Sequence, residues 1–123
     1  MKIGDKGTVT VKVTKENCAS AIGSGALDVF ATPSMIALME NAACEAIKQS
    51  LQEGESSVGT QVNISHLKAS PLNETITATA QLSNIEGRKL TFKVTAWDSN
   101  GTIGEGTHER FIINVEKFLS KLK

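Results

Sequence analysis

One glutamate lies among the apolar residues of a strongly helical segment. On a wheel turning about 100° per residue, Glu40 lies about 40° from Ile36, within an apolar stripe. The other members of the stripe are Met39, Ala43, Ile47 and Leu51. A carboxylate out of water is costly unless it is paired or protonated, so we expect Glu40 to be a dry general base. A packing acid with hydrogen bonds, or a helix tilted toward a subunit interface, would be the plainer explanations.

Two further side chains could share a site with Glu40. His66 ends an alternating segment on the face of Val58, Val62 and Ile64, where an imidazole could orient or move a proton, or be a satisfied core histidine. Thr32 precedes Pro33 and is expected to cap the helix while its hydroxyl still donates a proton. Eight residues of helical rise separate Thr32 from Glu40 by about 12 Å. They can meet only if the helix begins later or if they come from different subunits.

Weaker signals lie in the strand segments. Gly59, Gly104 and Gly106 indicate bulges or a close backbone approach, with a ligand as the second possibility. Arg110 could bind an anion through two N–H groups, although it and His108 are expected on a solvated strand face. We find no motif of α/β-hydrolases, dinucleotide-binding proteins or P-loop proteins, and no metal-ligand spacing.

Hydropathy patterning predicts an α+β protein with an antiparallel sheet and one long helix. Short turns at 86–88 and at Asn100-Gly101 should join neighbouring strands. The expected order is strand 8–14, loop 15–31, helix 32–52, strands 58–67, 75–82, 90–97 and 102–115, then a short helix 117–123. With no linker, repeat or low-complexity tract, residues 1–123 are predicted to form a single domain.

Composition narrows the functional classes. Thirteen basic and thirteen acidic residues give no net charge, and no basic cluster supports a nucleic-acid partner. No segment has the roughly 20 apolar residues of a membrane span, and the N-terminal segment is unlike a secretory signal. Cys18 and Cys44 are best interpreted as reduced thiols, so we expect a cytoplasmic protein.

Three blocks of the chain resemble the hotdog-fold thioesterases, in particular the fluoroacetyl-CoA thioesterase branch. They are VFATPSMIALMENAA at 29–43, VGTQVNISHLKASP at 58–71 and IGEGTHERFIINVEKF at 103–118. The resemblance implies a hotdog fold, with one sheet wrapped around a central helix. It also implies an acyl-CoA thioesterase that works as a homodimer or larger homo-oligomer, with sites at the subunit interface.

The resemblance also implies roles for individual residues. The catalytic positions of that branch hold Thr32, Glu40 and His66 here, and Gly59 and Arg110 match positions that contact substrate. No metal or cofactor is implied beyond the CoA of the substrate. The branch uses phenylalanines as a lid in a loop that corresponds to residues 19–28, which hold no aromatic residue here. We therefore expect another short or modest acyl group.

The three catalytic candidates would have different roles. Glu40 would act as base on water or as nucleophile, His66 would orient and move protons, and Thr32 would position the thioester. Two other functions are compatible with these residues: a hotdog dimer that binds an acyl-CoA without cleaving it, and a hydratase or dehydratase of acyl thioesters.

Overall fold

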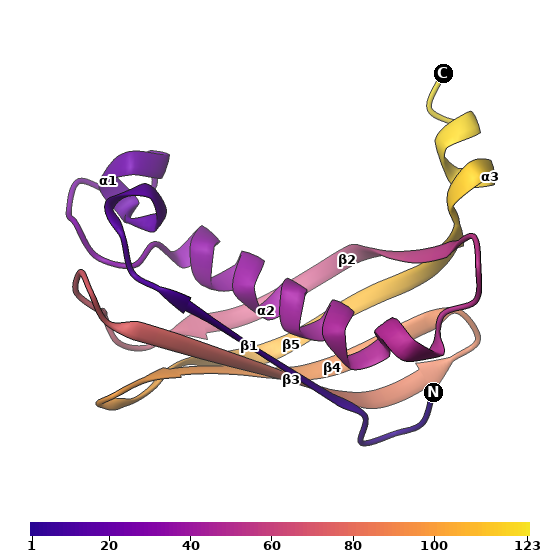
Figure 1. The fold of residues 1–123 in the computed structure, drawn as a ribbon, viewed down its shortest axis with the longest axis horizontal. Coiled ribbons are helices and arrows are strands. Elements are labelled where there is room, and N and C mark those ends of the chain that lie inside the picture. The colour runs from indigo at the N-terminus through magenta and orange to yellow at the C-terminus, as the bar shows by residue number, and fades with distance from the viewer.

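The architecture is a five-stranded antiparallel sheet with one long helix across a single face (Figure 1). It is described by a computed structural model covering all 123 residues. The strands are β1 (Lys6–Lys12), β2 (Glu55–His66), β3 (Thr75–Glu86), β4 (Lys89–Asp98) and β5 (Gly101–Asn114), in the order β1-β3-β4-β5-β2. The helices are α1 (Ala19–Ile22), α2 (Thr32–Ile47) and α3 (Val115–Ser120), with 3-10 turns at Lys15–Asn17 and Lys48–Ser50.

The core lies between α2 and the inner face of the sheet. The residues that alternation predicts to point inward from β3 and β4 are all buried: Ile76, Ala78, Ala80, Leu82, Leu90, Phe92, Val94 and Ala96. The opposing side chains of α2 are Met35, Leu38, Met39, Ala42, Ala43 and Ile47. At Gly7 of β1, a Cβ atom would lie 2.2 Å from the carbonyl oxygen of Ala42. Glycine therefore lets the edge strand approach the helix backbone closely.

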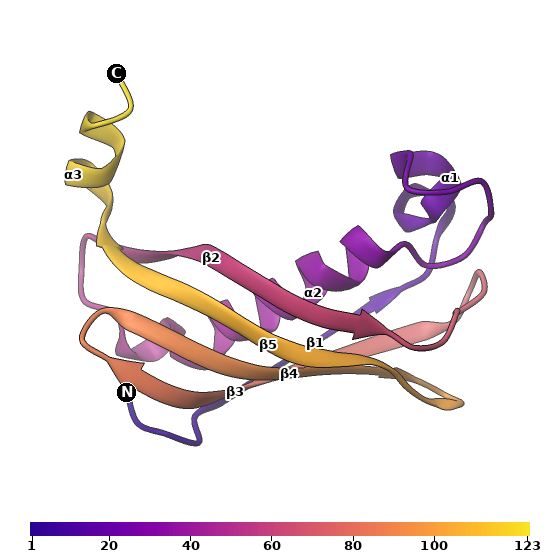
Figure 2. The same cartoon turned by 180° about the vertical axis from the view of Figure 1, so that it is seen from behind.

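The outer face of the sheet carries no helix. Seen from behind, the five strands lie open, with α1 and α3 at opposite ends of the molecule (Figure 2). Strand β2 forms one edge of the sheet, antiparallel to β5 and beside α2. Its terminal residue His66 lies near the start of α2, and Gly59 lies farther along the helix. This arrangement places candidate residues from a helix and an edge strand next to each other.

Several boundaries differ from the expectations. The first strand covers 6–12 rather than 8–14, and α2 ends at Ile47 rather than near 52 because its last turn tightens into a 3-10 helix. A left-handed Gly54 (φ 84°) then redirects the chain into β2. The expected turns at Gly87 and Asn100-Gly101 are confirmed. No helix is long and apolar enough to cross a membrane.

A bulge in β2 overturns the simple alternation of that strand. Gly59 pairs with Arg110 and Gln61 pairs with Glu109, so Thr60 is an extra residue. Directly opposed residues share a face, so Val58, paired with Phe111, faces away from the helix, contrary to the prediction. The bulge brings Gly59 onto the same face as Val62, Ile64 and His66. Without it, Gly59 and His66, seven residues apart, would point to opposite faces.

Candidate active site

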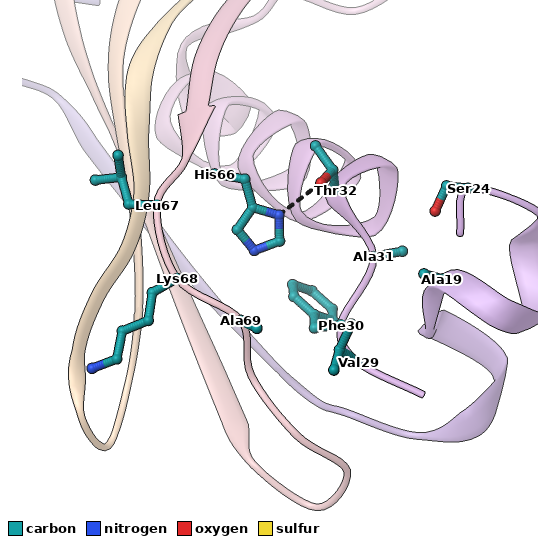
Figure 3. A pocket seen from close by; sticks show the side chains of 10 residues that line it. All are labelled: Ala19, Ser24, Val29, Phe30, Ala31, Thr32, His66, Leu67, Lys68 and Ala69. Carbon is teal, nitrogen blue, oxygen red and sulfur yellow. Dashed lines mark hydrogen bonds between the residues drawn. The ribbon is translucent and has the colours of Figure 1, made fainter. Parts of the chain in front are cut away.

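The closest polar contact among the candidates joins Thr32 to His66. Thr32 Oγ1 lies 2.7 Å from His66 Nδ1, at the point where the start of α2 meets the end of β2 (Figure 3). The prediction that Thr32 caps the helix is wrong: Ala31 occupies the cap position, and no side chain caps the helix there. The hydroxyl of Thr32 instead bonds the imidazole, so a residue that begins the helix also anchors the histidine.

The second ring nitrogen of His66 is buried without a hydrogen-bond partner. It lies on the side of the ring turned away from Thr32, toward Phe30 and Lys68 (Figure 3). Most buried polar atoms have a partner, and an unpartnered one costs about 1–3 kcal/mol. Burial lowers the pKa of His66, so the imidazole is favoured in its neutral form. A neutral ring bonded to a hydroxyl is suited to holding or moving a proton.

A cavity of about 310 Å³ adjoins this pair. Both Thr32 and His66 line it, and the rest of its wall is largely small or apolar (Figure 3). The other lining residues are Ala19, Ser24, Val29, Phe30, Ala31, Leu67, Lys68 and Ala69. The segment from α1 to the start of α2, expected to be a loop with a helical turn, thus forms one side of the cavity.

Glu40 occupies a different place from the one expected. Its side chain is 39% exposed in the isolated chain, so the prediction of a dry carboxyl group inside the apolar stripe is wrong for the isolated chain. The residues of α2 that are in fact buried centre on Met39 and Ala42, which turns Glu40 to the shoulder of the helix. There its Oε2 lies 3.5 Å from Arg110 Nη1.

Gly59 lies directly under this carboxylate. A Cβ atom built on Gly59 would lie 2.7 Å from Glu40 Oε2. The position therefore combines the bulge and the close backbone approach that the sequence indicates for this glycine. The approach that the structure contains is to Glu40, and glycine is what leaves room for the acid beside the strand.

Arg110 and His108 are buried, contrary to the solvated strand face expected for them. Arg110 is 7% exposed and His108 is 1% exposed, because Gly104, Gly106 and these two residues all point inward from β5. Arg110 donates from Nε to Ser57 Oγ at 2.8 Å and from Nη2 to the carbonyl oxygen of Ser57 at 3.0 Å. No functional role was predicted for His108, and Ser57 was not among the candidates. The two glycines that precede His108 at a spacing of two were the signal for its inward face.

The candidates thus form two groups within one chain. Thr32 and His66 are bonded to each other, whereas Glu40 lies with Gly59 and Arg110. The helix is continuous from Thr32 to Ile47, so eight residues of rise keep Thr32 and Glu40 about 12 Å apart. A later helix start, one of the two ways to unite them, is excluded. No three His, Cys, Asp or Glu side chains are grouped so that they could hold a metal ion.

For the thioester hydrolysis that the resemblance implies, replacing Gly59 with alanine is expected to lower kcat/KM by about a hundredfold, because moving a reacting group by about 1 Å costs that much. The added methyl group must displace the Glu40 carboxylate. That carboxylate ends a flexible side chain, but the methyl group would also lie 3.2 Å from His108 Cε1 and 3.3 Å from Arg110 Nη1, which are buried, so the melting temperature should fall by a few degrees. Ser56→Ala, on the same strand, is the control and should stay within twofold of wild type. An active Gly59→Ala enzyme would show that the position of this acid is unimportant.

The free energy of unfolding is expected to fall as the pH is lowered from about 7 toward 5. Burial lowers the pKa of both His66 and His108 below 6.5, so the unfolded chain binds more protons in this window. The neutral histidines therefore contribute stability that is present above pH 6.5 and is lost as pH falls through their folded values. Urea unfolding at a series of pH values measures the slope. The double variant His66→Asn/His108→Gln should have a shallower slope, and equal slopes would refute this origin.

Known proteins resemble the chain along nearly its whole length. The family model for the fluoroacetyl-CoA-specific thioesterase matches residues 13–116. The fluoroacetyl-CoA thioesterase of Streptantibioticus cattleyicolor is 45% identical over 96 residues, which are 78% of this chain and 69% of that protein.

Several solved structures also resemble this chain over most of its length. A complex of a variant of the fluoroacetyl-CoA-specific thioesterase FlK with fluoroacetate and CoA has a TM-score of 0.91 and 38% identity, covering 96% of this chain and 99% of that one. A thioesterase superfamily member from Thermus thermophilus has a TM-score of 0.91 and 27% identity, covering 98% and 90%. A hot-dog-like protein from Thermanaerovibrio acidaminovorans, 23% identical with a TM-score of 0.90 over 99% and 90% of the two chains, shares the fold. The chain has the hotdog fold and belongs to the fluoroacetyl-CoA-specific thioesterase family.

Proposed function

We propose that this protein is an acyl-CoA thioesterase that hydrolyses a short or modest acyl-CoA to the free acid and CoA. Membership of the thioesterase family supports the reaction class. The observation that carries the assignment to a site is the 2.7 Å contact between Thr32 Oγ1 and His66 Nδ1 beside a cavity. No metal or other cofactor takes part beyond the CoA of the substrate.

The hydroxyl and imidazole prepare the thioester. His66 in its Nδ1–H form donates to Thr32 Oγ1, which leaves the hydroxyl proton of Thr32 free to bond the thioester carbonyl oxygen. That bond strengthens as the oxygen gains negative charge, so it favours the tetrahedral intermediate. The start of α2 lies nearby and adds the positive potential of a helix N-terminus.

Glu40 supplies the base. Its carboxylate accepts a proton from a water molecule whose oxygen attacks the carbonyl carbon. The carbon–sulfur bond then breaks, and the departing thiolate takes up the proton held by Glu40, which releases CoA as the thiol. The acid product keeps the water oxygen. Each proton and each electron pair is accounted for without an oxidant or reductant.

A second copy of the chain completes the site in this proposal. Within one chain Glu40 is too far from Thr32 to act on the same carbonyl. Thr32 and His66 therefore come from one subunit, and Glu40 comes from the other. The edge strand β2 is the surface for this pairing: it is twelve residues long, has no Lys or Pro, and is mostly half-buried or exposed. Such an edge normally needs protection from further strand pairing, and a second β2 provides it.

Sedimentation equilibrium tests the assembly. The proposal expects a homodimer or a larger homo-oligomer at micromolar concentration. A protein that is monomeric and fully active would contradict the shared site.

The walls of the cavity support a small acyl group. Four of the residues around Thr32 and His66 are Ala19, Ser24, Ala31 and Ala69, and residues 19–28 hold no aromatic side chain. The related FlK variant was crystallised with fluoroacetate and CoA. Here the same end of the fold lacks an aromatic cover in that loop, so we expect acceptance of unfluorinated short chains. Both cysteines are free, which supports a location in the cytoplasm.

A panel of acyl-CoA esters from two to twelve carbons tests the function. Purified protein is mixed with each ester, free thiol is measured with a chromogenic disulfide, and product masses are recorded. Hydrolysis of a short ester to acid and CoA is the expected result. Products that retain the CoA would indicate hydration instead, and binding without turnover of any ester would indicate a carrier; either would contradict the proposal.

A further inference from the structure

We infer that His108 is a positioning residue for Glu40: its neutral imidazole fixes the Arg110 guanidinium, which in turn holds the carboxylate. The inference rests on the proposed thioesterase function, because it assigns His108 a role in keeping the base of that reaction in place. His108 lies behind Arg110 and touches neither the cavity nor Thr32, so it acts through another residue.

Two hydrogen bonds decide where the proton of His108 lies. Its Nδ1 is 2.8 Å from the carbonyl oxygen of Gln61, which only accepts. Its Nε2 is 3.1 Å from Nη1 of Arg110, which only donates. The ring must therefore carry its proton on Nδ1 and leave Nε2 as an acceptor. Neither the other neutral tautomer nor the imidazolium satisfies both partners.

Arg110 is locked on three sides. Ser57 accepts from Nε and Nη2, and His108 accepts from Nη1. The guanidinium is planar and its donors have fixed directions, so these bonds hold Nη1 3.5 Å from Glu40 Oε2. Removing the His108 acceptor frees the Nη1 end of the fork, the end that contacts the acid.

The surroundings keep His108 neutral. Phe92 of β4 stacks on the ring with centroids 6.2 Å apart. Arg110 of β5 and Glu40 of α2 are the charged groups on its own face of the sheet, and Glu109 of β5 acts on it from the opposite face. Burial lowers the pKa of His108, with Arg110 acting in the same direction, while the Gln61 carbonyl and the two glutamates act against them. The ring is therefore uncharged at neutral pH, as the acceptor role requires.

A purely structural role would require neither this tautomer nor these hydrogen bonds. An apolar ring of similar size, packed on Phe92, would fill the same space. The polar arrangement differs from that alternative in two measurable ways: the tautomer of the ring, and the response of the chemical step to loss of the acceptor.

Nuclear magnetic resonance tests the tautomer in the resting protein. The chain has two histidines, so in His66→Asn the remaining imidazole signals belong to His108. Long-range proton–nitrogen correlations at pH 7 should show a protonated Nδ1 and an unprotonated Nε2. A protonated Nε2, either alone or with Nδ1, would overturn the inference.

Steady-state kinetics test the role. His108→Phe keeps the ring volume and loses the acceptor, so kcat should fall about tenfold to a hundredfold with KM nearly unchanged. His108→Gln restores an acceptor for Arg110 and should recover most of kcat. Phe92→Leu loosens the packing around the ring but leaves the hydrogen bonds, and should stay within twofold. Wild-type kcat in His108→Phe, or equal losses in all three variants, would contradict the inference.

The two proposals can fail separately. If the wild-type protein cleaves no acyl-CoA, the proposed function fails, and the tautomer measurement still reports whether the His108–Arg110 contact has the inferred polarity. If the wild type is active and the tautomer or the kinetic pattern is wrong, the inference fails and the thioesterase stands. Should His108→Phe not fold, the tautomer measurement alone decides.

Discussion

Glu40→Gln is expected to lower kcat/KM for the best acyl-CoA by about a thousandfold, within the range found when a general base is removed. Glutamine has the same shape, and its carbonyl oxygen can take the place of Glu40 Oε2 beside Arg110 Nη1, but it cannot take a proton from water. The loss should fall on kcat more than on KM, because the acid acts in the transition state rather than in binding. Thiol release measured over a range of substrate concentrations gives both constants.

The control for this variant is Glu45→Gln on the same helix. Glu45 is exposed and lies 4.0 Å from Lys48, so its removal should leave kcat/KM within twofold and stability nearly unchanged. The melting temperature of Glu40→Gln should also stay within a few degrees of wild type. If Glu40→Gln retained more than half of the activity, the assignment of Glu40 as base would be wrong.

The sequence predicted the central strands and the start of the long helix well. Every residue of β3 and β4 that alternation predicted to point inward is buried, because both strands lie inside the sheet and pack their inner faces on α2. The Thr-Pro pair placed the start of the helix at residue 32. Local patterns succeed here because the buried face of each element faces one core.

The site could be predicted only in part. The sequence named Thr32 and His66, but it could not show that the hydroxyl bonds the imidazole instead of capping the helix, since that contact joins residues 34 positions apart. One extra residue in β2, Thr60, reverses the alternation, and no local signal besides Gly59 marked it.

The environment of Glu40 was even more difficult to predict from the sequence. A wheel shows spacing around a helix but not which angle faces the sheet, and a choice of zero at Ile36 put the acid inside the core. In the fold it lies on the shoulder, where Arg110 approaches it from β5. The burial of Arg110 and His108 depends on Ser57 and Gln61 of the neighbouring strand, whose register the sequence does not state.

The central claim, that two chains build each site, predicts rescue between two inactive variants. Thr32→Ala and Glu40→Gln chains with different tags are co-expressed, and mixed assemblies are purified on both tags in turn. In a mixed dimer one of the two sites keeps an intact Thr32 and an intact Glu40, so about half of the wild-type activity should return.

The reciprocal mixture gives the opposite result. A chain with both substitutions, paired with a wild-type chain, damages both shared sites and should be nearly inactive. Thiol release from these two mixed dimers is the deciding measurement: the account predicts about half activity in the first and background in the second. Background in the first and half activity in the second would show that each chain carries its own complete site, and would contradict the account.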